Sequence, residues 1–174
     1  MSILIVAGGS ELDEAIVRRL IEQGDDPRIL EQSSGRRDLW RSLGAHVAVG
    51  DPADADLLER AAQNVRTIVV AGPEVDQLVL EAVVASAPRA GADRIVVCVP
   101  AIGEAVTRLL HESTLSYVLI ATGRRGVLRR STAAPELVAE AVDAADDLDG
   151  HPRLEVNLRD GSGMEDLGLV ARDD

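Results

Sequence analysis

The sequence predicts a doubly wound α/β fold, in which a parallel sheet of about six to seven strands is covered by helices on both faces. Short apolar runs alternate with amphipathic stretches from one end of the chain to the other, which is the pattern of successive β-α-β units. Several of the apolar runs are continuous rather than alternating, as expected for strands that are buried on both faces.

Seven segments have the length and the composition of single strands, with Val, Ile and Leu predominating. These predicted strands are residues 3–7, 28–31, 46–49, 67–71, 94–99, 117–121 and 154–158.

Helical periodicity fills the intervals between the predicted strands. The clearest pattern covers residues 10–23 and places Leu12, Ile16 and Leu20 on one stripe. A second covers residues 74–87, and its inward-facing side chains are predicted to be Leu78, Val79, Ala82 and Val83. Further helices are predicted over residues 35–43, 53–63, 102–113 and 134–146.

The 174 residues suffice for one domain with its own core, and no internal repeat or low-complexity linker divides them. We expect a domain over residues 1–158 and an acidic, glycine-containing tail over residues 159–174. That tail carries Gly161, Gly163 and Gly168, and we expect it to be loosely packed.

The charge balance argues against nucleic acid as a partner. The formal net charge is −12, and all 18 basic residues are arginine. Binding to a phosphate backbone requires clustered basic residues, and base stacking requires aromatic side chains, of which this chain has only Trp40 and Tyr117. Any mechanism that needs a lysine is also excluded.

The sequence predicts a cytoplasmic protein without a membrane span. The first residues lack the basic segment of an export signal, and no apolar run reaches the length of about 18 residues that crosses a bilayer. The single cysteine, Cys98, stands within a strand-like apolar run, so we expect a buried thiol rather than a nucleophile.

The turn between the first predicted strand and the first helix has the position of a phosphate-binding loop. Ala7-Gly8-Gly9-Ser10 follows the strand, and free amides at a helix N-terminus attract phosphate there. On this loop, and on residues 44–51, 93–99 and 110–120, the chain resembles the NmrA-like group of atypical short-chain dehydrogenases/reductases over roughly residues 3 to 158. The resemblance implies a Rossmann fold that binds NAD(P). The residues it places at the cofactor are Gly8, Gly9, Ser10, Leu12, Glu31, Arg36, Asp51 and Ala71.

The loop departs from the family pattern Gly-x-x-Gly-x-x-Gly, because Ala7, Ser10 and Asp13 replace its three glycines. Glu11, Asp13 and Glu14 place three carboxylates in the first helical turn. A bound pyrophosphate would meet repulsion of roughly 3 kcal/mol per contact at an effective dielectric constant near 20. We interpret Ser10 and Asp13 as a helix N-cap pair, in competition with a phosphate-binding role.

Two further positions bear on the nucleotide. Glu31, at the end of the second strand, has the place of the acid that binds a ribose 2′-hydroxyl, whereas Arg36 and Arg37 would suit a 2′-phosphate. The alternative is an ordinary charged surface turn.

The family's catalytic residues are missing. Familiar members use a Tyr-x-x-x-Lys pair and a serine after the fifth strand. This chain has no lysine, and Pro100-Ala101 follows its fifth predicted strand. We predict a packing role for Tyr117 and no catalytic residues. His46, His111 and His151 match no metal-binding spacing, so no metal site is predicted.

One concentrated basic segment follows the sixth predicted strand. Arg124-Arg125 and Arg129-Arg130 would suit an anionic ligand or an acidic partner surface, or form a solvated charge cluster.

These observations favour a pseudoenzyme, a non-redox regulatory or accessory protein whose binding of NAD(P) is weak or lost. It would act through a protein partner or as a homo-oligomer. The alternative is an NAD(P)-dependent oxidoreductase or epimerase that lacks the Tyr/Lys pair. A cyclase or isomerase that uses Arg124 or His111 is a third hypothesis, which no residue set supports.

Overall fold

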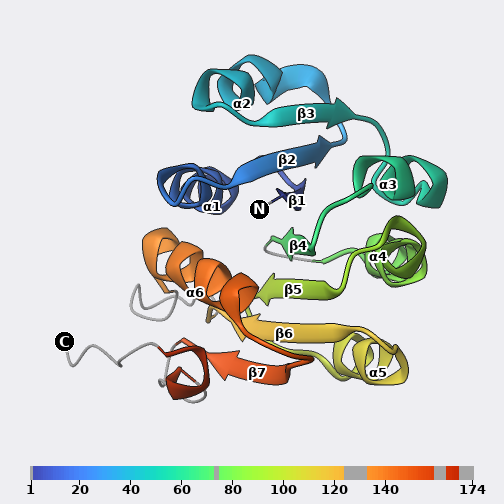
Figure 1. The fold of residues 1–174 in the computed structure, drawn as a ribbon, viewed down its shortest axis with the longest axis vertical. Coiled ribbons are helices and arrows are strands. Elements are labelled where there is room, and N and C mark those ends of the chain that lie inside the picture. Colours follow the sequence, from blue (N-terminus) through green and yellow to red (C-terminus); the bar gives the residue numbers. More distant parts are fainter. Residues whose placement is uncertain (1, 73–74, 124–132, 159–163, 169–174) are drawn as a thin grey trace.

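The computed structural model describes residues 2–72, 75–123, 133–158 and 164–168. They include a seven-stranded parallel sheet with the strand order β3-β2-β1-β4-β5-β6-β7 (Figure 1). The predicted doubly wound fold is confirmed. The strands are β1 (Ser2–Ala7), β2 (Asp26–Glu31), β3 (His46–Val49), β4 (Thr67–Ala71), β5 (Arg94–Val99), β6 (Ser116–Ala121) and β7 (Arg153–Asn157).

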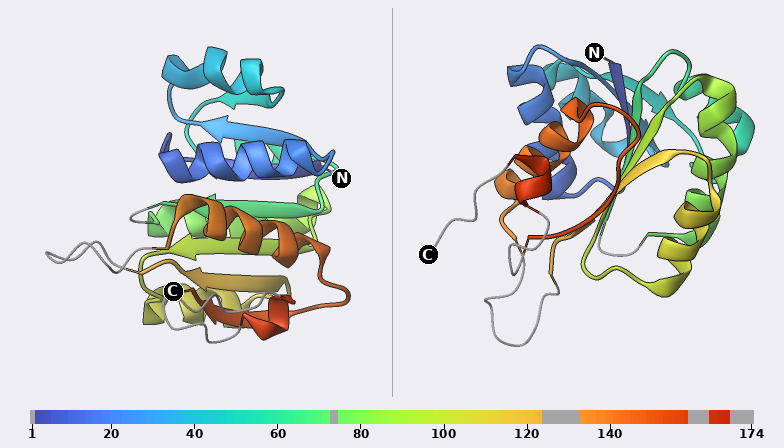
Figure 2. Two further views of the ribbon diagram at one scale, coloured as in Figure 1. Left: turned by 90° about the vertical axis from the view of Figure 1, so that its left-hand side faces the viewer. Right: turned by 60° about the horizontal axis from the view of Figure 1, so that its bottom comes forward.

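Helices cover both faces of the sheet. They are α1 (Glu11–Glu22), α2 (Arg37–Leu43), α3 (Ala55–Ala61), α4 (Gln77–Ala90), α5 (Glu104–Glu112) and α6 (Pro135–Asp147), with short 3₁₀ turns at Ser34–Arg36 and Glu165–Leu167. Helices α1, α2 and α6 lie on one face, and α3, α4 and α5 lie on the other (Figure 1). Figure 2 shows α1 and α6 side by side across the first face.

Alternate strand residues supply the two halves of the core. Ile3, Ile5 and Val69 pack beneath α1, α2 and α6, whereas Leu4, Ile68 and Val97 pack beneath α3, α4 and α5. The central strands β4, β5 and β6 are buried at every position, so their continuous apolar runs match strands that are covered on both sides. Cys98 is fully buried in β5, as predicted. Among the described residues, no helix combines the length and the apolar character needed to cross a membrane.

Helix α4 faces the core with Val79, Ala82 and Val83, as predicted, but not with Leu78. Leu78 is 63% exposed, and Leu80 is buried in its place. The helix begins at Gln77, where the Asp76 carboxylate accepts a hydrogen bond from the Leu78 N–H at 2.9 Å. Its buried series runs from Leu80 through Val83, and helical periodicity then places Leu78 toward solvent.

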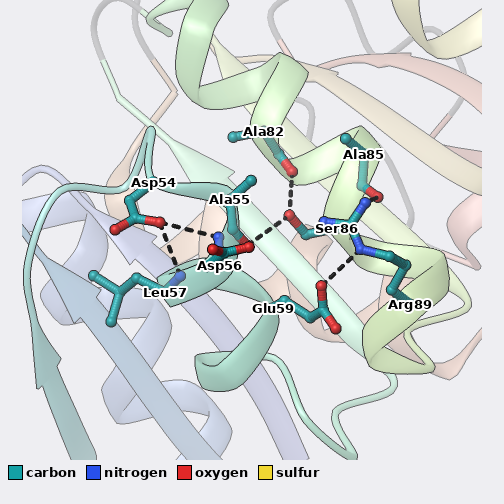
Figure 3. Close-up of polar contacts among 9 residues, drawn as sticks. All are labelled: Asp54, Ala55, Asp56, Leu57, Glu59, Ala82, Ala85, Ser86 and Arg89. Atoms are coloured by element: carbon teal, nitrogen blue, oxygen red, sulfur yellow. Dashed lines mark hydrogen bonds and ion pairs between the residues drawn. The ribbon is translucent and has the colours of Figure 1, made fainter.

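Polar contacts join α3 to α4 (Figure 3). The Ser86 hydroxyl lies 2.6 Å from the Ala82 carbonyl oxygen and 3.2 Å from that of Ala55, and Arg89 pairs with Glu59 at 2.6 Å. Asp54 caps α3 by accepting from backbone amides. These contacts hold together two helices whose leading ends lie at the carboxyl edge of the sheet.

A buried arginine fixes the end of α6. Arg94, the first residue of β5, is 4% exposed and donates to the carbonyl oxygens of Ala145, Asp146 and Leu148, each at 2.6 Å. These are carbonyls that the helix itself leaves unpaired at its C-terminus. Thr67 donates to the Asp146 carboxylate beside them. The cluster lies at the amino ends of β4 and β5, so its role is structural.

Part of the expected tail is packed rather than loose. Met164 and Leu167 are 3% and 6% exposed and belong to the core beneath α1 and α6. Apolar side chains on a short 3₁₀ turn therefore anchor residues 164–168 to the domain despite the surrounding glycines and acids.

Replacing the buried arginine should destabilise the fold strongly. Arg94→Met leaves the carbonyl oxygens of Ala145, Asp146 and Leu148 without their side-chain donor, and we expect it to lower the free energy of unfolding by about 3 kcal/mol or more. Urea denaturation measures the change. The matched control is Arg89→Met, which removes a half-exposed ion pair and should cost less than about 1 kcal/mol. Equal effects of the two substitutions would contradict this role for Arg94.

Candidate nucleotide-binding crevice

A cleft of about 490 Å³ opens at the carboxyl edge of the sheet, where the strand order reverses between β1 and β4. This switch point is where open α/β sheets bind their ligands. The lining residues are Val6, Gly8, Gly9, Glu31, Gln32, Ser33, Arg36, Asp51, Pro52, Val70, Ala71, Val75, Asp76 and Val79.

The cleft brings together most of the predicted cofactor-binding residues. Gly8, Gly9, Glu31, Arg36, Asp51 and Ala71 all line it. Ser10 and Leu12 are not among its lining residues, because Ser10 caps α1 and the half-buried Leu12 packs against the core. The lining also includes Val75, just before α4, and Val79, in the first turn of α4; the sequence predicted only a helix over this stretch.

The turn from β1 into α1 is closed by its own side chains. Gly9 adopts a left-handed conformation (φ +78°) that favours glycine. Ser10 then caps α1: its hydroxyl accepts from the Asp13 N–H at 3.2 Å, and its own N–H donates to Asp13 Oδ2 at 2.7 Å. The Ser10 hydroxyl also lies 2.9 Å from the same oxygen. The predicted N-cap pair is confirmed as a reciprocal capping box.

The carboxylate of Asp13 lies inside this turn. The residue is fully buried, and its second oxygen, Oδ1, is buried without a hydrogen-bond partner. Burial raises the pKa of the Asp13 carboxyl, while the N–H and hydroxyl of Ser10 and the amides of Gly9 and Gly8 oppose that rise. Burial also raises the pKa of the Cys98 thiol, and the nearby Asp13 raises it further.

Part of the hydrogen-bonding capacity of this turn is directed inward, toward Asp13. Phosphate binds here only if the loop amides point outward and the surroundings are neutral or positive. In this chain the Ser10 amide donates inward to Asp13, and Gly8 and Gly9 lie against the same carboxylate. The protein therefore buries an acid beneath this turn, and the acid takes up the Ser10 amide.

The other half of the crevice suits a ribose. Glu31 ends β2, is 4% exposed, and accepts from Trp40 Nε1 through Oε2 at 3.1 Å. Its Oε1 is buried without a partner, on a residue that lines the cleft. An unpaired buried carboxylate oxygen favours a ligand that donates a hydrogen bond, such as a sugar hydroxyl.

Trp40 was not predicted as part of this site. It is fully buried in α2, nine residues after Glu31, and it orients the glutamate carboxylate. The sequence shows it only as the single tryptophan of an amphipathic segment.

Arg36 joins α2 to the loop. Its guanidinium lies 5.7 Å from the centre of the Trp40 ring and donates weakly to the Ser10 carbonyl oxygen at 3.4 Å. Among the lining residues it is the one basic side chain, whereas Glu31, Asp51 and Asp76 are acidic. The crevice as a whole is therefore acidic.

Tyr117 lies far from the crevice, which agrees with the predicted packing role. It is the second residue of β6, so about four residues of strand, or roughly 13 Å, separate it from the carboxyl edge. The side chain is 2% exposed, with the His111 ring 5.5 Å away and the Arg153 guanidinium 5.9 Å from its ring centre.

Other predicted features give no second site. Within the described ranges, no group of three or more His, Cys, Asp or Glu side chains is arranged for a metal ion. The basic segment of Arg124, Arg125, Arg129 and Arg130 lies outside the described residues. A smaller cleft of about 330 Å³ lies toward the amino halves of β1, β2 and β3, away from the switch point.

The fold and the crevice define an α/β domain of the NAD(P)-binding Rossmann type. The family model of the TrkA-N domain matches residues 4–100, more than half of the chain, and the protein therefore belongs to that family. A comparison with curated proteins found no match.

Several solved structures share the fold over most of this chain. ChuY, an anaerobillin reductase from Escherichia coli O157:H7, superposes with a TM-score of 0.74 at 14% identity and covers 90% of this chain and 95% of its own. A putative NAD-dependent epimerase/dehydratase from Bacillus halodurans gives 0.72 at 15% identity, with 89% and 92% covered. An NADPH-dependent quinone oxidoreductase from Escherichia coli, complexed with NADPH, gives 0.69 at 18% identity, with 89% and 68% covered. At these identities the likeness establishes the fold.

The buried acid predicts a pH-dependent difference in stability. Because folding raises the pKa of Asp13 above its ordinary value of 3.8, the contribution of this residue to stability is present at low pH and is lost as pH rises through the folded pKa. Asp13→Asn cannot ionise and keeps an acceptor for the Ser10 amide. Its stability relative to the unmodified protein should therefore increase as pH rises from about 4 to about 7.

Urea denaturation at a series of pH values measures this difference. Leu78→Ala, a neutral substitution at an exposed position, should shift stability by a constant amount across the same range. A difference for Asp13→Asn that stays constant or shrinks as pH rises would contradict a pKa of Asp13 that burial raises.

Proposed function

We propose that this protein is a non-redox regulatory or accessory protein, in which the Rossmann crevice serves as a ligand site rather than as a site of hydride transfer. The observation that carries the proposal is the capping box of Ser10 and Asp13, which fills the phosphate loop from within. A hydride-transfer enzyme of this fold must hold a dinucleotide firmly across that loop.

The chemistry of the remaining residues supports the proposal. The chain contains no lysine, so it cannot lower the pKa of a tyrosine in the manner of the familiar short-chain enzymes. Its one tyrosine lies at the opposite edge of the sheet from the crevice. After β5 the chain continues with Pro100 and Ala101, which carry no proton donor. We place the protein in the cytoplasm, acting through a protein partner or a second copy of itself.

The second candidate is an NAD(P)-dependent oxidoreductase or epimerase without the Tyr/Lys pair. The retained ribose side of the crevice favours it, since Glu31 still presents a free carboxylate oxygen. The solved structures named as a reductase and as a putative epimerase/dehydratase also support this second candidate. On this hypothesis the capping box would have to open when the cofactor binds.

A cofactor titration separates the two candidates. We expect NADH and NADPH to raise the melting temperature of the purified protein by less than about 1 °C at about 1 mM, because ligand stabilisation follows the free ligand concentration relative to Kd. We also expect no loss of 340 nm absorbance with quinone or carbonyl acceptors. Saturable stabilisation together with acceptor-dependent oxidation of NADH or NADPH would overturn the non-redox proposal and establish the second candidate.

A further inference from the structure

The smaller cleft, of about 330 Å³, differs in charge from the rest of the molecule. It lies beside the edge strand β3, and the charged and titratable side chains that line it are those of Arg28, Arg41 and His46. Among the described residues, no aspartate or glutamate lines it, although the chain carries 30 acidic residues and a formal net charge of −12. Asp26, whose carboxylate lies 3.4 Å from the His46 ring, is not a lining residue. We call this site the β3 cleft.

We propose that the β3 cleft binds an aliphatic carboxylate, which is a monoanion with an apolar body. The cleft is separate from the switch-point crevice, so the proposal does not depend on the non-redox function proposed above. Two observations carry it: a pair of arginines without an acidic partner, and the apolar surface between them.

The register of the sheet brings the polar and the apolar part of the cleft together. Arg28 and His46 are partners on the parallel strands β2 and β3, so their side chains point to the same face of the sheet. Leu4 is the partner of Arg28 on β1, and Ala48 lies two residues after His46, so both share that face. Ala61, at the end of α3, also lines the cleft.

The second arginine comes from a helix on the other face. Arg41 lies in the last turn of α2, and Figure 1 shows α2 next to β3 at the edge of the sheet. Arg28 and Arg41 therefore reach the β3 cleft from different elements.

The positive charge of these two arginines is not neutralised. The Arg28 guanidinium donates to the Gln63 carbonyl oxygen at 2.6 Å, which holds it in place but leaves its charge unpaired. In the part of the chain that the structure describes, no carboxylate forms an ion pair with Arg28 or Arg41. The described ion pairs of arginine involve Arg18, Arg19, Arg66 and Arg89. A guanidinium presents N–H donors in a planar fork that matches the two oxygens of a carboxylate.

The apolar lining and the size of the cleft restrict the ligand further. Leu4, Ile29, Val47 and Ala48 give it an apolar surface, which an aliphatic body covers and a free inorganic anion does not. A volume of about 330 Å³ is near the lower limit for small-molecule sites, so the cleft suits a ligand smaller than a nucleotide. The acidic remainder of the molecule repels a dianion more strongly than a monoanion.

Isothermal titration calorimetry of the full chain tests the proposal. The probes are octanoate, its neutral analogue octanamide, butanoate and inorganic phosphate, all at one pH and ionic strength. We expect octanoate to bind about tenfold or more tightly than octanamide, because only the anion pairs with the arginines. It should also bind more tightly than phosphate, and about tenfold or more tightly than butanoate, which buries fewer methylene groups.

Amide NMR spectra and one variant locate the binding. Octanoate should shift the N–H signals of residues 45–48 and leave those of Gly8 and Gly9 unchanged. Arg41→Gln should weaken octanoate about tenfold and leave octanamide within about twofold. Arg108→Gln is the matched control, because it removes the same charge from an exposed position on α5, near the other end of the sheet (Figure 1), and it should alter neither affinity.

Several results would overturn the proposal. They are equal binding of octanoate and octanamide, tighter binding of phosphate than of octanoate, octanoate shifts at Gly8 and Gly9 rather than at residues 45–48, or no octanoate binding up to about 10 mM. The comparison of octanoate with octanamide needs no substitution, so the test holds even if Arg41→Gln fails to fold. None of these results bears on hydride transfer, which the cofactor titration tests separately.

Discussion

A carboxylate buried inside the turn between β1 and α1 fixes the conformation of the loop beside the crevice. Asp13 stands where the NmrA-like sequence pattern has a glycine, and its carboxylate needs hydrogen-bond donors. Ser10 supplies them through its N–H and its hydroxyl. Burying a carboxyl group costs free energy unless the group is hydrogen-bonded. The inward-pointing N–H and hydroxyl of Ser10 reduce that cost for Asp13. The Ser10 N–H and hydroxyl are then directed inward, toward Asp13, rather than toward the crevice.

The topology of the sheet concentrates this effect. Parallel strands bring the ends of β2 and β3 to one edge, so Glu31 and Asp51 line the cleft there together with Asp76, which precedes α4. Their carboxylates give the crevice the same sign as the whole molecule, whose formal net charge is −12. The described part of the chain places Arg36 as the one opposing charge in the lining. A site built in this way selects for hydrogen-bond donors.

Local features of the fold could be predicted from the sequence because they depend on neighbouring residues. Short apolar runs predicted the positions of all seven strands, and the spacing of Ser10 and Asp13 predicted the cap of α1. On α4 only the placement of Leu78 was wrong: the helix begins at a cap supplied by Asp76, and Leu78 lies in its first turn, on the exposed side.

Contacts between distant residues could not be predicted in this way. Arg94 reaches the end of α6 across about 50 positions of sequence, and nothing in its own segment distinguishes it from a surface arginine. The pairing of Trp40 with Glu31 depends on how α2 packs against β2. Which oxygen of each buried acid lacks a partner is a property of the packed structure alone.

The most direct test of the central claim is an amide NMR spectrum recorded during a titration with NAD⁺. If the phosphate loop is closed by Asp13, the Ser10 N–H should show the downfield shift of an amide bonded to a carboxylate, and Asp13→Asn should reduce that shift. The amides of Gly8, Gly9 and Ser10 should then stay unchanged with NAD⁺ at about 1 mM. Saturable shifts of these three amides at micromolar NAD⁺ would contradict the account, because they would show that the loop opens and receives the pyrophosphate.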